Sequence, residues 1–140
     1  MMTRHDEVAL AVSWWKMISG GQGHLGSDGS PLPWQESVPT APADLADAYD
    51  FAAIRALVDE QAHREAGLRE LLEILGVTPL MIVYEDFIRG YEQTVRRVLD
   101  YLGLGNAVQD IPPPLLARTS DQVDEEWVKR YLSDLNTDSQ

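Results

Sequence analysis

Residues 80–86 read LMIVYED, and this short apolar run decides the fold class of the chain. Pro79 introduces the run, and its apolar residues do not alternate with polar ones. A run of this length and pattern is typical of a strand that is buried on both faces, as in a parallel sheet. Such a strand needs neighbours for its amide groups, and residues 1–3 are the candidate for a second strand. The sequence therefore predicts an α/β fold that is mostly helical and has few parallel strands.

Segments with helical periodicity surround this run. Asp50 is a plausible N-cap for the clearest of them, and Gly76 stands where a helix-terminating glycine belongs. Apolar residues recur at helical spacing over four ranges, which we predict as helices: 6–18, 50–75, 91–102 and 124–135.

Two segments lack a regular period. Residues 19–48 are rich in glycine and proline, and a loop of this length inside a compact domain is typical of a functional lid or a linker. We favour the lid, because Trp34 could pin it to a surface. Residues 136–140 have the composition of a flexible tail. The whole chain, residues 1–140, is predicted to be one domain or a portion of one.

Composition narrows the class of partner. The chain carries 23 acidic and 11 basic residues, a net charge of −12, which disfavours nucleic acid and anionic membranes as partners. It has no cysteine, no apolar run long enough to span a bilayer, and no recognisable signal peptide. We therefore expect a cytoplasmic protein, in which an anionic ligand needs a local arginine to hold it.

The stretch TRHDEVALAVSWWKM, residues 3–17, offers such an arginine. Arg4 has a planar charged fork suited to phosphate oxygens. Ser13 lies seven residues beyond Asp6, about 10 Å along a helix, with its hydroxyl leaning back towards the helix N-terminus. A phosphate on the helix flank could touch both residues. The alternative is a solvated arginine and a serine that bonds to a carbonyl of the preceding turn.

Four stretches together resemble one family, the sulfotransferases that use the sulfate donor PAPS (3′-phosphoadenosine 5′-phosphosulfate). Residues 3–17 resemble the segment that binds the 3′-phosphate of PAPS, and residues 79–104 resemble the strand, Tyr-Glu-Asp turn and helix near the C-terminal end of the family fold. Residues 48–80 and 115–135 are similar to the bacterial trehalose 2-sulfotransferase-like branch. The resemblance implies the C-terminal portion of a P-loop-like domain.

The function that this resemblance implies is transfer of a sulfuryl group from PAPS to a carbohydrate hydroxyl, with release of PAP (3′-phosphoadenosine 5′-phosphate). It implies that Arg4 and Ser13 bind the 3′-phosphate. No glycine-rich phosphate loop stands before Arg4, and we cannot place the family's catalytic glutamate in this chain. We therefore expect the isolated chain to be truncated and inactive, and we assign no catalytic residue.

Several other residues could bear on the site. His24 in the predicted lid could act as a base, although a solvated histidine is the simpler interpretation. Arg118 stands in the region from which a further donor contact could come. The Tyr84-Glu85-Asp86 turn is interpreted as structural, because neighbouring side chains on a strand point to opposite faces.

The three histidines are too far apart in the sequence to suggest a metal site. The alternative to a sulfotransferase is a non-catalytic helical interaction or oligomerisation module, because an incomplete sheet has edges that recruit partners. On either interpretation we expect a homo-oligomer.

Overall fold

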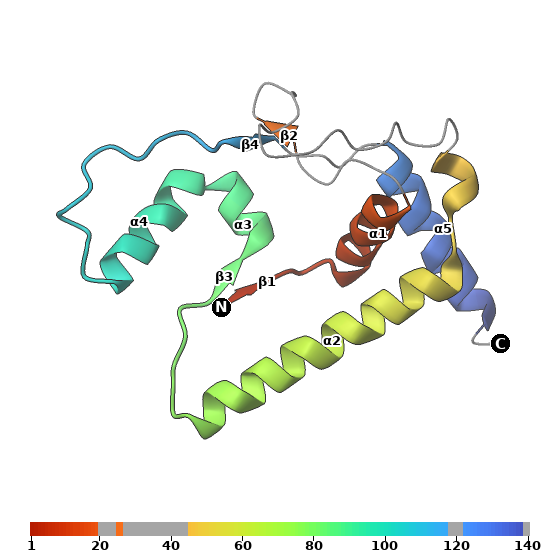
Figure 1. Cartoon of the computed structure of the whole chain (residues 1–140), viewed down its shortest axis with the longest axis horizontal. Coiled ribbons are helices and arrows are strands. Elements are labelled where there is room, and N and C mark those ends of the chain that lie inside the picture. Colours follow the sequence, from red (N-terminus) through yellow and green to blue (C-terminus); the bar gives the residue numbers. More distant parts are fainter. Residues whose placement is uncertain (20–24, 27–44, 118–121, 139–140) are drawn as a thin grey trace. The chain divides into compact units, whose positions relative to one another are not determined.

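The computed structural model describes residues 1–19, 25–26, 45–117 and 122–138 (Figure 1). The chain divides into two compact units. The first unit comprises residues 1–5 and 63–114, and the second comprises residues 6–62 and 115–140. The candidate functional site lies in the first unit, and most of the buried apolar core lies in the second.

A short parallel sheet forms the centre of the first unit. Strand β1 (Met2–Thr3) pairs with β3 (Ile82–Val83), with Met2 opposite Ile82 and Thr3 opposite Val83. The predicted parallel pair between residues 1–3 and the apolar run is therefore confirmed. The run itself is less extended than predicted, because helix α3 (Tyr84–Arg89) begins directly after Val83.

Two helices follow the sheet in the first unit. Helix α3 ends at Arg89, Gly90 separates the two helices, and α4 (Tyr91–Tyr101) starts immediately after that glycine. The predicted helix over residues 91–102 is confirmed within one residue. Gly103 has a φ of 72°, a left-handed conformation that glycine adopts without steric cost, and it follows the end of α4.

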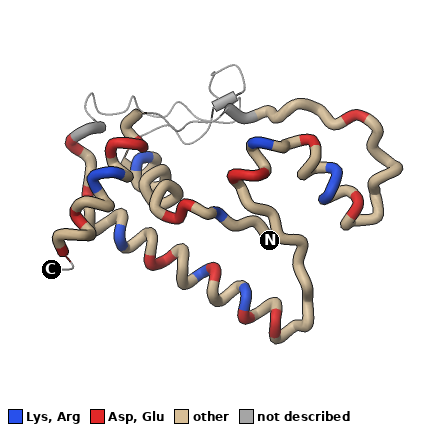
Figure 2. Tube along the Cα trace, turned by 180° about the vertical axis from the view of Figure 1, so that it is seen from behind, with Lys and Arg blue, Asp and Glu red and all other residues tan. Residues whose placement is uncertain are grey.

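The longest helix, α2 (Phe51–Ile74), runs from the second unit into the first. The Asp50 carboxylate accepts a hydrogen bond of 2.9 Å from the Ala53 amide, which is the N-cap contact predicted for it. Gly76 has a φ of 63° and donates its amide to the Glu73 carbonyl, as a helix-terminating glycine does. Basic and acidic positions alternate along this helix (Figure 2), and Arg69 pairs with Glu65 one turn away.

The second unit buries the main hydrophobic core. Helix α1 (Glu7–Ile18) packs on α5 (Gln122–Asp138), and the N-terminal half of α2 and the 3-10 helix η1 (Leu45–Ala48) belong to the same unit. The Asp6 carboxylate caps α1 by accepting the Ala9 amide at 2.8 Å. The most deeply buried apolar side chains are Ala11, Val12, Ile54, Trp127 and Tyr131.

An ion pair lies inside this unit. The Lys16 ammonium is 2.8 Å from the Asp124 carboxylate, and the side chains are 8% and 9% exposed. A charge that is buried to this extent is costly unless it has a partner of opposite sign, and here each side chain is the partner of the other. The pair joins α1 to α5, and the N–H of the Trp15 indole donates to the Ala48 carbonyl at 2.7 Å to join α1 to η1.

Only parts of the predicted loop and of the predicted tail lie among the described residues. Within residues 19–48, the short strand β2 (Leu25–Gly26) pairs antiparallel with β4 (Leu116–Ala117). The rest of the predicted lid before η1, including His24 and Trp34, lies outside the described residues after Ser19. Helix α5 extends to Asp138 instead of ending at residue 135, so residues 136–138 of the predicted tail are helical. No described helix has both the length and the apolar character needed to cross a membrane.

Candidate functional site

The candidate site lies where the two parallel strands end. Arg4 and His5 follow β1, and Tyr84 and Glu85 follow β3. Because the strands are parallel and in register, their carboxyl ends meet at one edge of the sheet. In open α/β sheets this is the edge at which ligands bind.

The Arg4 guanidinium is held against an aromatic ring. Its Cζ atom lies 3.9 Å from the centroid of the Tyr84 ring. A guanidinium stacked on a ring uses its face for the cation–π contact and keeps its N–H donors in the plane, where they can bind an anion. Among the residues that the structure describes, none forms a hydrogen bond or ion pair with this guanidinium. Arg4 is thus a half-buried, oriented cation with available donors.

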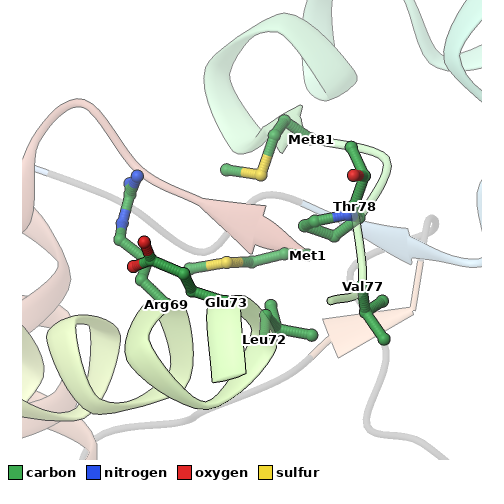
Figure 3. Close-up of a pocket in the computed structure, with 8 residues that line it drawn as sticks. Met1, Arg69, Leu72, Glu73, Val77, Thr78 and Met81 are labelled. Atoms are coloured by element: carbon green, nitrogen blue, oxygen red, sulfur yellow. The ribbon is translucent and has the colours of Figure 1, made fainter. Parts of the chain in front are cut away.

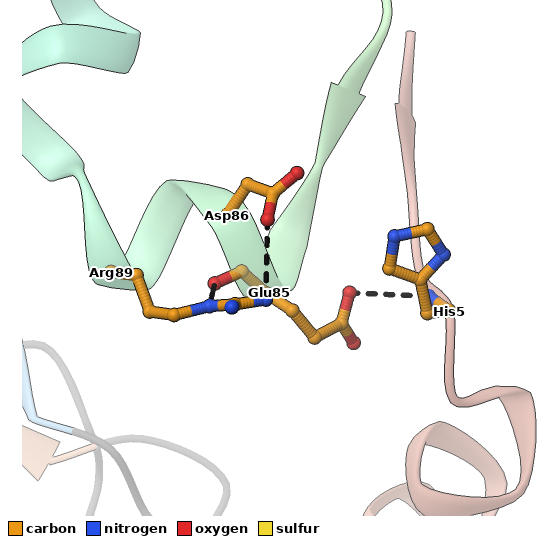
Figure 4. Close-up of polar contacts among 4 residues, drawn as sticks. All are labelled: His5, Glu85, Asp86 and Arg89. Atoms are coloured by element: carbon orange, nitrogen blue, oxygen red, sulfur yellow. Dashed lines mark hydrogen bonds and ion pairs between the residues drawn. The ribbon is translucent and has the colours of Figure 1, made fainter.

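Glu85 ties the ends of the two strands together. Its Oε2 atom accepts the His5 amide at 3.1 Å (Figure 4). Burial acts to raise the pKa of Glu85. The amides of His5 and of Glu85 itself, together with the nearby charge of Arg4, outweigh burial, so the pKa lies below the usual value of 4.5. The carboxylate is therefore ionised at neutral pH and holds the backbone beside Arg4.

Asp86 and Arg89 form a separate pair on the exposed side of α3. Arg89 Nη2 lies 3.2 Å from Asp86 Oδ1, and Arg89 Nε donates to the Glu85 carbonyl at 2.9 Å (Figure 4). The side chains are 72% and 63% exposed, so this contact contributes little to stability. The two bonds hold the Arg89 side chain along α3, the helix that also carries Glu85.

The turn Tyr84-Glu85-Asp86 requires a correction. We predicted that its side chains alternate across a strand, but the three residues form the first turn of α3. The prediction was wrong because a helix can begin directly after an apolar run whose β-branched residues favour a strand. The interpretation of the turn as structural agrees with the bond from the His5 amide to Glu85.

The other predicted site residues lie elsewhere. Ser13 is half-buried in the middle of α1, in the second unit, whereas Arg4 belongs to the first unit. His24 and Arg118 lie outside the described residues. Sequence reasoning missed the partnership of Arg4 with Tyr84. The one sequence signal for this contact was that an aromatic residue, Tyr84, directly follows β3.

The chain belongs to the Stf0 sulphotransferase family, because a sequence model of that family matches residues 1–134. The trehalose 2-sulfotransferase of Mycobacterium tuberculosis (strain Erdman) is 28% identical over 133 residues, which are 94% of this chain and 44% of that protein. The trehalose 2-sulfotransferase of Mycolicibacterium smegmatis is 28% identical over 135 residues, which are 96% of this chain and 45% of that protein. This chain therefore spans less than half the length of these relatives. No solved structure matches it.

Replacing Tyr84 with leucine is expected to release the Arg4 side chain, whereas Tyr84→Phe is expected to retain it. Phenylalanine keeps the ring face, and a cation–π contact at such a site contributes about 0.5–1 kcal/mol. The Arg4 Nε–H group should become more mobile on the nanosecond timescale in Tyr84→Leu only, as measured by heteronuclear NMR relaxation. Equal mobility in all three proteins would contradict the contact.

Acidification is expected to weaken the link between the strand ends. Because the pKa of Glu85 is lower in the folded state, its stabilising contribution is complete above about pH 4.5 and declines as the pH falls through the folded-state pKa. The His5 amide resonance should follow this ionisation, with a midpoint below pH 4.5 in an NMR titration. Glu85→Gln should abolish that transition, and a midpoint above pH 4.5 would refute the assignment.

Proposed function

We propose that this chain supplies the 3′-phosphate-binding part of a PAPS site in a sulfotransferase with a P-loop-like fold. In the reaction, an acceptor hydroxyl oxygen attacks the sulfur of PAPS. The bond between sulfur and the bridging phosphate oxygen breaks, PAP leaves, and the hydroxyl proton passes to a base. A carbohydrate hydroxyl is the proposed acceptor, on the strength of the names of the two relatives.

One observation carries the proposal. The Arg4 guanidinium lies at the carboxyl edge of a parallel strand pair, stacked on Tyr84, with its N–H donors available. A permanently charged planar fork in this position suits a phosphate, and it overcomes locally the repulsion expected from a net charge of −12. For Ser13, which lies in the second unit, a contact with the 3′-phosphate stays a prediction.

The proposal assigns no catalytic base and no metal. Among the described residues, no three histidine or acidic side chains lie together in a way that could hold a metal ion. The described residues are proposed to bind and orient the nucleotide, and the isolated chain is proposed to bind PAP weakly without transferring sulfuryl groups.

Calorimetric titration with PAP and with adenosine 5′-phosphate tests this function. The two nucleotides differ by the 3′-phosphate, which is the group that Arg4 is proposed to bind. We expect PAP to bind at least ten times more tightly than adenosine 5′-phosphate. Equal affinities, or no binding of PAP at millimolar concentration, would show that the chain has no 3′-phosphate site.

A further inference from the structure

The register of the strand pair continues beyond its backbone ladder. Partners in the ladder are 80 positions apart in the sequence, and the next two contacts keep this offset. Arg4 stacks on Tyr84. The His5 amide donates to the Glu85 carboxylate (Figure 4). The ladder stops because α3 begins at Tyr84, and the Glu85 side chain takes the place of the carbonyl that a longer strand would offer to the His5 amide.

The bond to Glu85 acts on the peptide group next to Arg4. The His5 nitrogen and the Arg4 carbonyl belong to one planar peptide unit, so this bond fixes the backbone directly after the Arg4 Cα atom. The ladder fixes the backbone before that atom, and Tyr84 holds the guanidinium at the far end of the side chain. Arg4 is therefore held at three points, and Glu85 supplies one of them.

The strand pair is too short to orient Arg4 by its ladder alone. Each strand has two residues, and a two-stranded sheet is marginally stable by itself. The amino end of the pair borders a pocket of about 270 Å³, which Met1, Leu72 and Met81 help to line (Figure 3). Because that end is not filled by packed side chains, the contacts at the carboxyl end become important for holding Arg4.

The charge of Glu85 by itself opposes the binding of an anion. The Arg4 guanidinium is near enough to interact with the Glu85 carboxylate, which is ionised at neutral pH. The same carboxylate is therefore expected to repel a phosphate bound to Arg4. The bond to the His5 amide acts in the opposite direction, because it restricts Arg4 before the ligand arrives. The sign of the effect of Glu85 on affinity distinguishes these two contributions.

We propose that Glu85 is a positioning residue of the 3′-phosphate site: by holding the His5 amide it orients Arg4, so that an acidic side chain strengthens the binding of an anion. This inference rests on the proposed function, since the anion is the 3′-phosphate of PAP. Loss of one charge-assisted hydrogen bond that orients a binding group is expected to weaken binding about three- to tenfold. The loss is smaller than that expected for removal of Arg4, whose guanidinium is the group that contacts the phosphate.

Two substitutions at Glu85 separate the hydrogen bond from the charge. Glu85→Ala removes both, whereas Glu85→Gln removes the charge and keeps an oxygen that can accept the His5 amide. In calorimetric titrations with PAP at neutral pH, we expect Glu85→Ala to bind about three- to tenfold more weakly than the wild-type chain. Glu85→Gln should restore the affinity to within about twofold of the wild-type value, because the acceptor is retained.

Asp86 provides the matched control for the lost charge. It is the neighbouring acidic residue in the first turn of α3, it pairs with Arg89 on the same helix, and its side chain is 63% exposed. Asp86→Ala removes one negative charge, as Glu85→Ala does, and leaves the bond to the His5 amide in place. The PAP affinity of Asp86→Ala should stay within about twofold of the wild-type value, because exposed charges are screened by salt.

A measurement without ligand tests the positioning of Arg4 directly. The Arg4 Nε–H group should be more mobile on the nanosecond timescale in Glu85→Ala than in the wild-type chain, as measured by heteronuclear NMR relaxation, and Glu85→Gln should restore the wild-type mobility. Unchanged mobility in Glu85→Ala would overturn the proposal.

Three results of the titrations would also overturn it: PAP binding by Glu85→Ala that is as tight as in the wild-type chain or tighter, equal losses in Glu85→Ala and Glu85→Gln, or equal losses in Glu85→Ala and Asp86→Ala. Failure of the proposed function is recognised separately. In that case the wild-type chain itself shows no preference for PAP over adenosine 5′-phosphate. If the wild-type chain shows the preference and Glu85→Ala keeps it in full, only the positioning role of Glu85 is wrong.

Discussion

Replacing Arg4 with alanine is expected to weaken PAP binding by about 10- to 100-fold, the largest functional effect of any single substitution in the site. A charge-assisted hydrogen bond contributes about 1.5–3 kcal/mol, and the stacked guanidinium offers its donors with little loss of side-chain freedom. Calorimetric titration of the variant against PAP measures the effect.

Arg96→Ala is the matched control for this prediction. Arg96 lies on α4 in the first unit and pairs with Glu92 at 2.8 Å. Because Arg96→Ala also replaces an arginine with alanine, it changes the net charge by the same amount as Arg4→Ala. PAP affinity should stay within a factor of about two, because exposed charges at a distance are screened by salt. Equal losses in Arg4→Ala and Arg96→Ala would mean that the total charge governs binding.

Replacing Ile54 with alanine is expected to lower the free energy of unfolding of the second unit by about 2–5 kcal/mol. Ile54 is 0% exposed and lies in the core cluster with Val12 and Trp127. The substitution removes buried methyl groups and leaves a cavity between well-packed helices. Urea unfolding followed by tryptophan fluorescence reports the change, since Trp127 belongs to the same cluster.

Two further substitutions bracket this value. Ile54→Val should cost about 0.5–1.5 kcal/mol, because it removes a single methylene group. Leu132→Ala should change the stability by less than about 0.5 kcal/mol, because Leu132 is 45% exposed on α5. A loss for Ile54→Ala no larger than that for Leu132→Ala would contradict the assignment of the core.

The helices and the strand pair could be predicted because their signals are local. Asp50 and Gly76 mark the ends of α2 in the sequence, and the structure uses both as predicted. The parallel pairing of residues 1–3 followed from a general need, since a strand of residues such as Ile82 and Val83 requires a neighbour. A local signal or an unmet hydrogen-bonding need was sufficient in each case.

The site was predictable only in part, because its contacts join residues far apart in the sequence. Arg4 was identified from its chemistry and from the family resemblance. Its stacking on Tyr84 depends on the register of two strands separated by about eighty residues, which no local pattern encodes. The bond from the His5 amide to Glu85 has the same origin, and it also required α3 to begin at Tyr84.

The most direct measurement of the proposed 3′-phosphate site is the phosphorus-31 NMR spectrum of PAP in the presence of the chain. PAP carries two phosphates with separate resonances, and only the 3′-phosphate is proposed to contact Arg4. We predict that the 3′ resonance shifts or broadens more than the 5′ resonance with the wild-type chain, and that this difference disappears with Arg4→Ala. Equal changes at both phosphates, or an effect that persists in Arg4→Ala, would contradict the assignment.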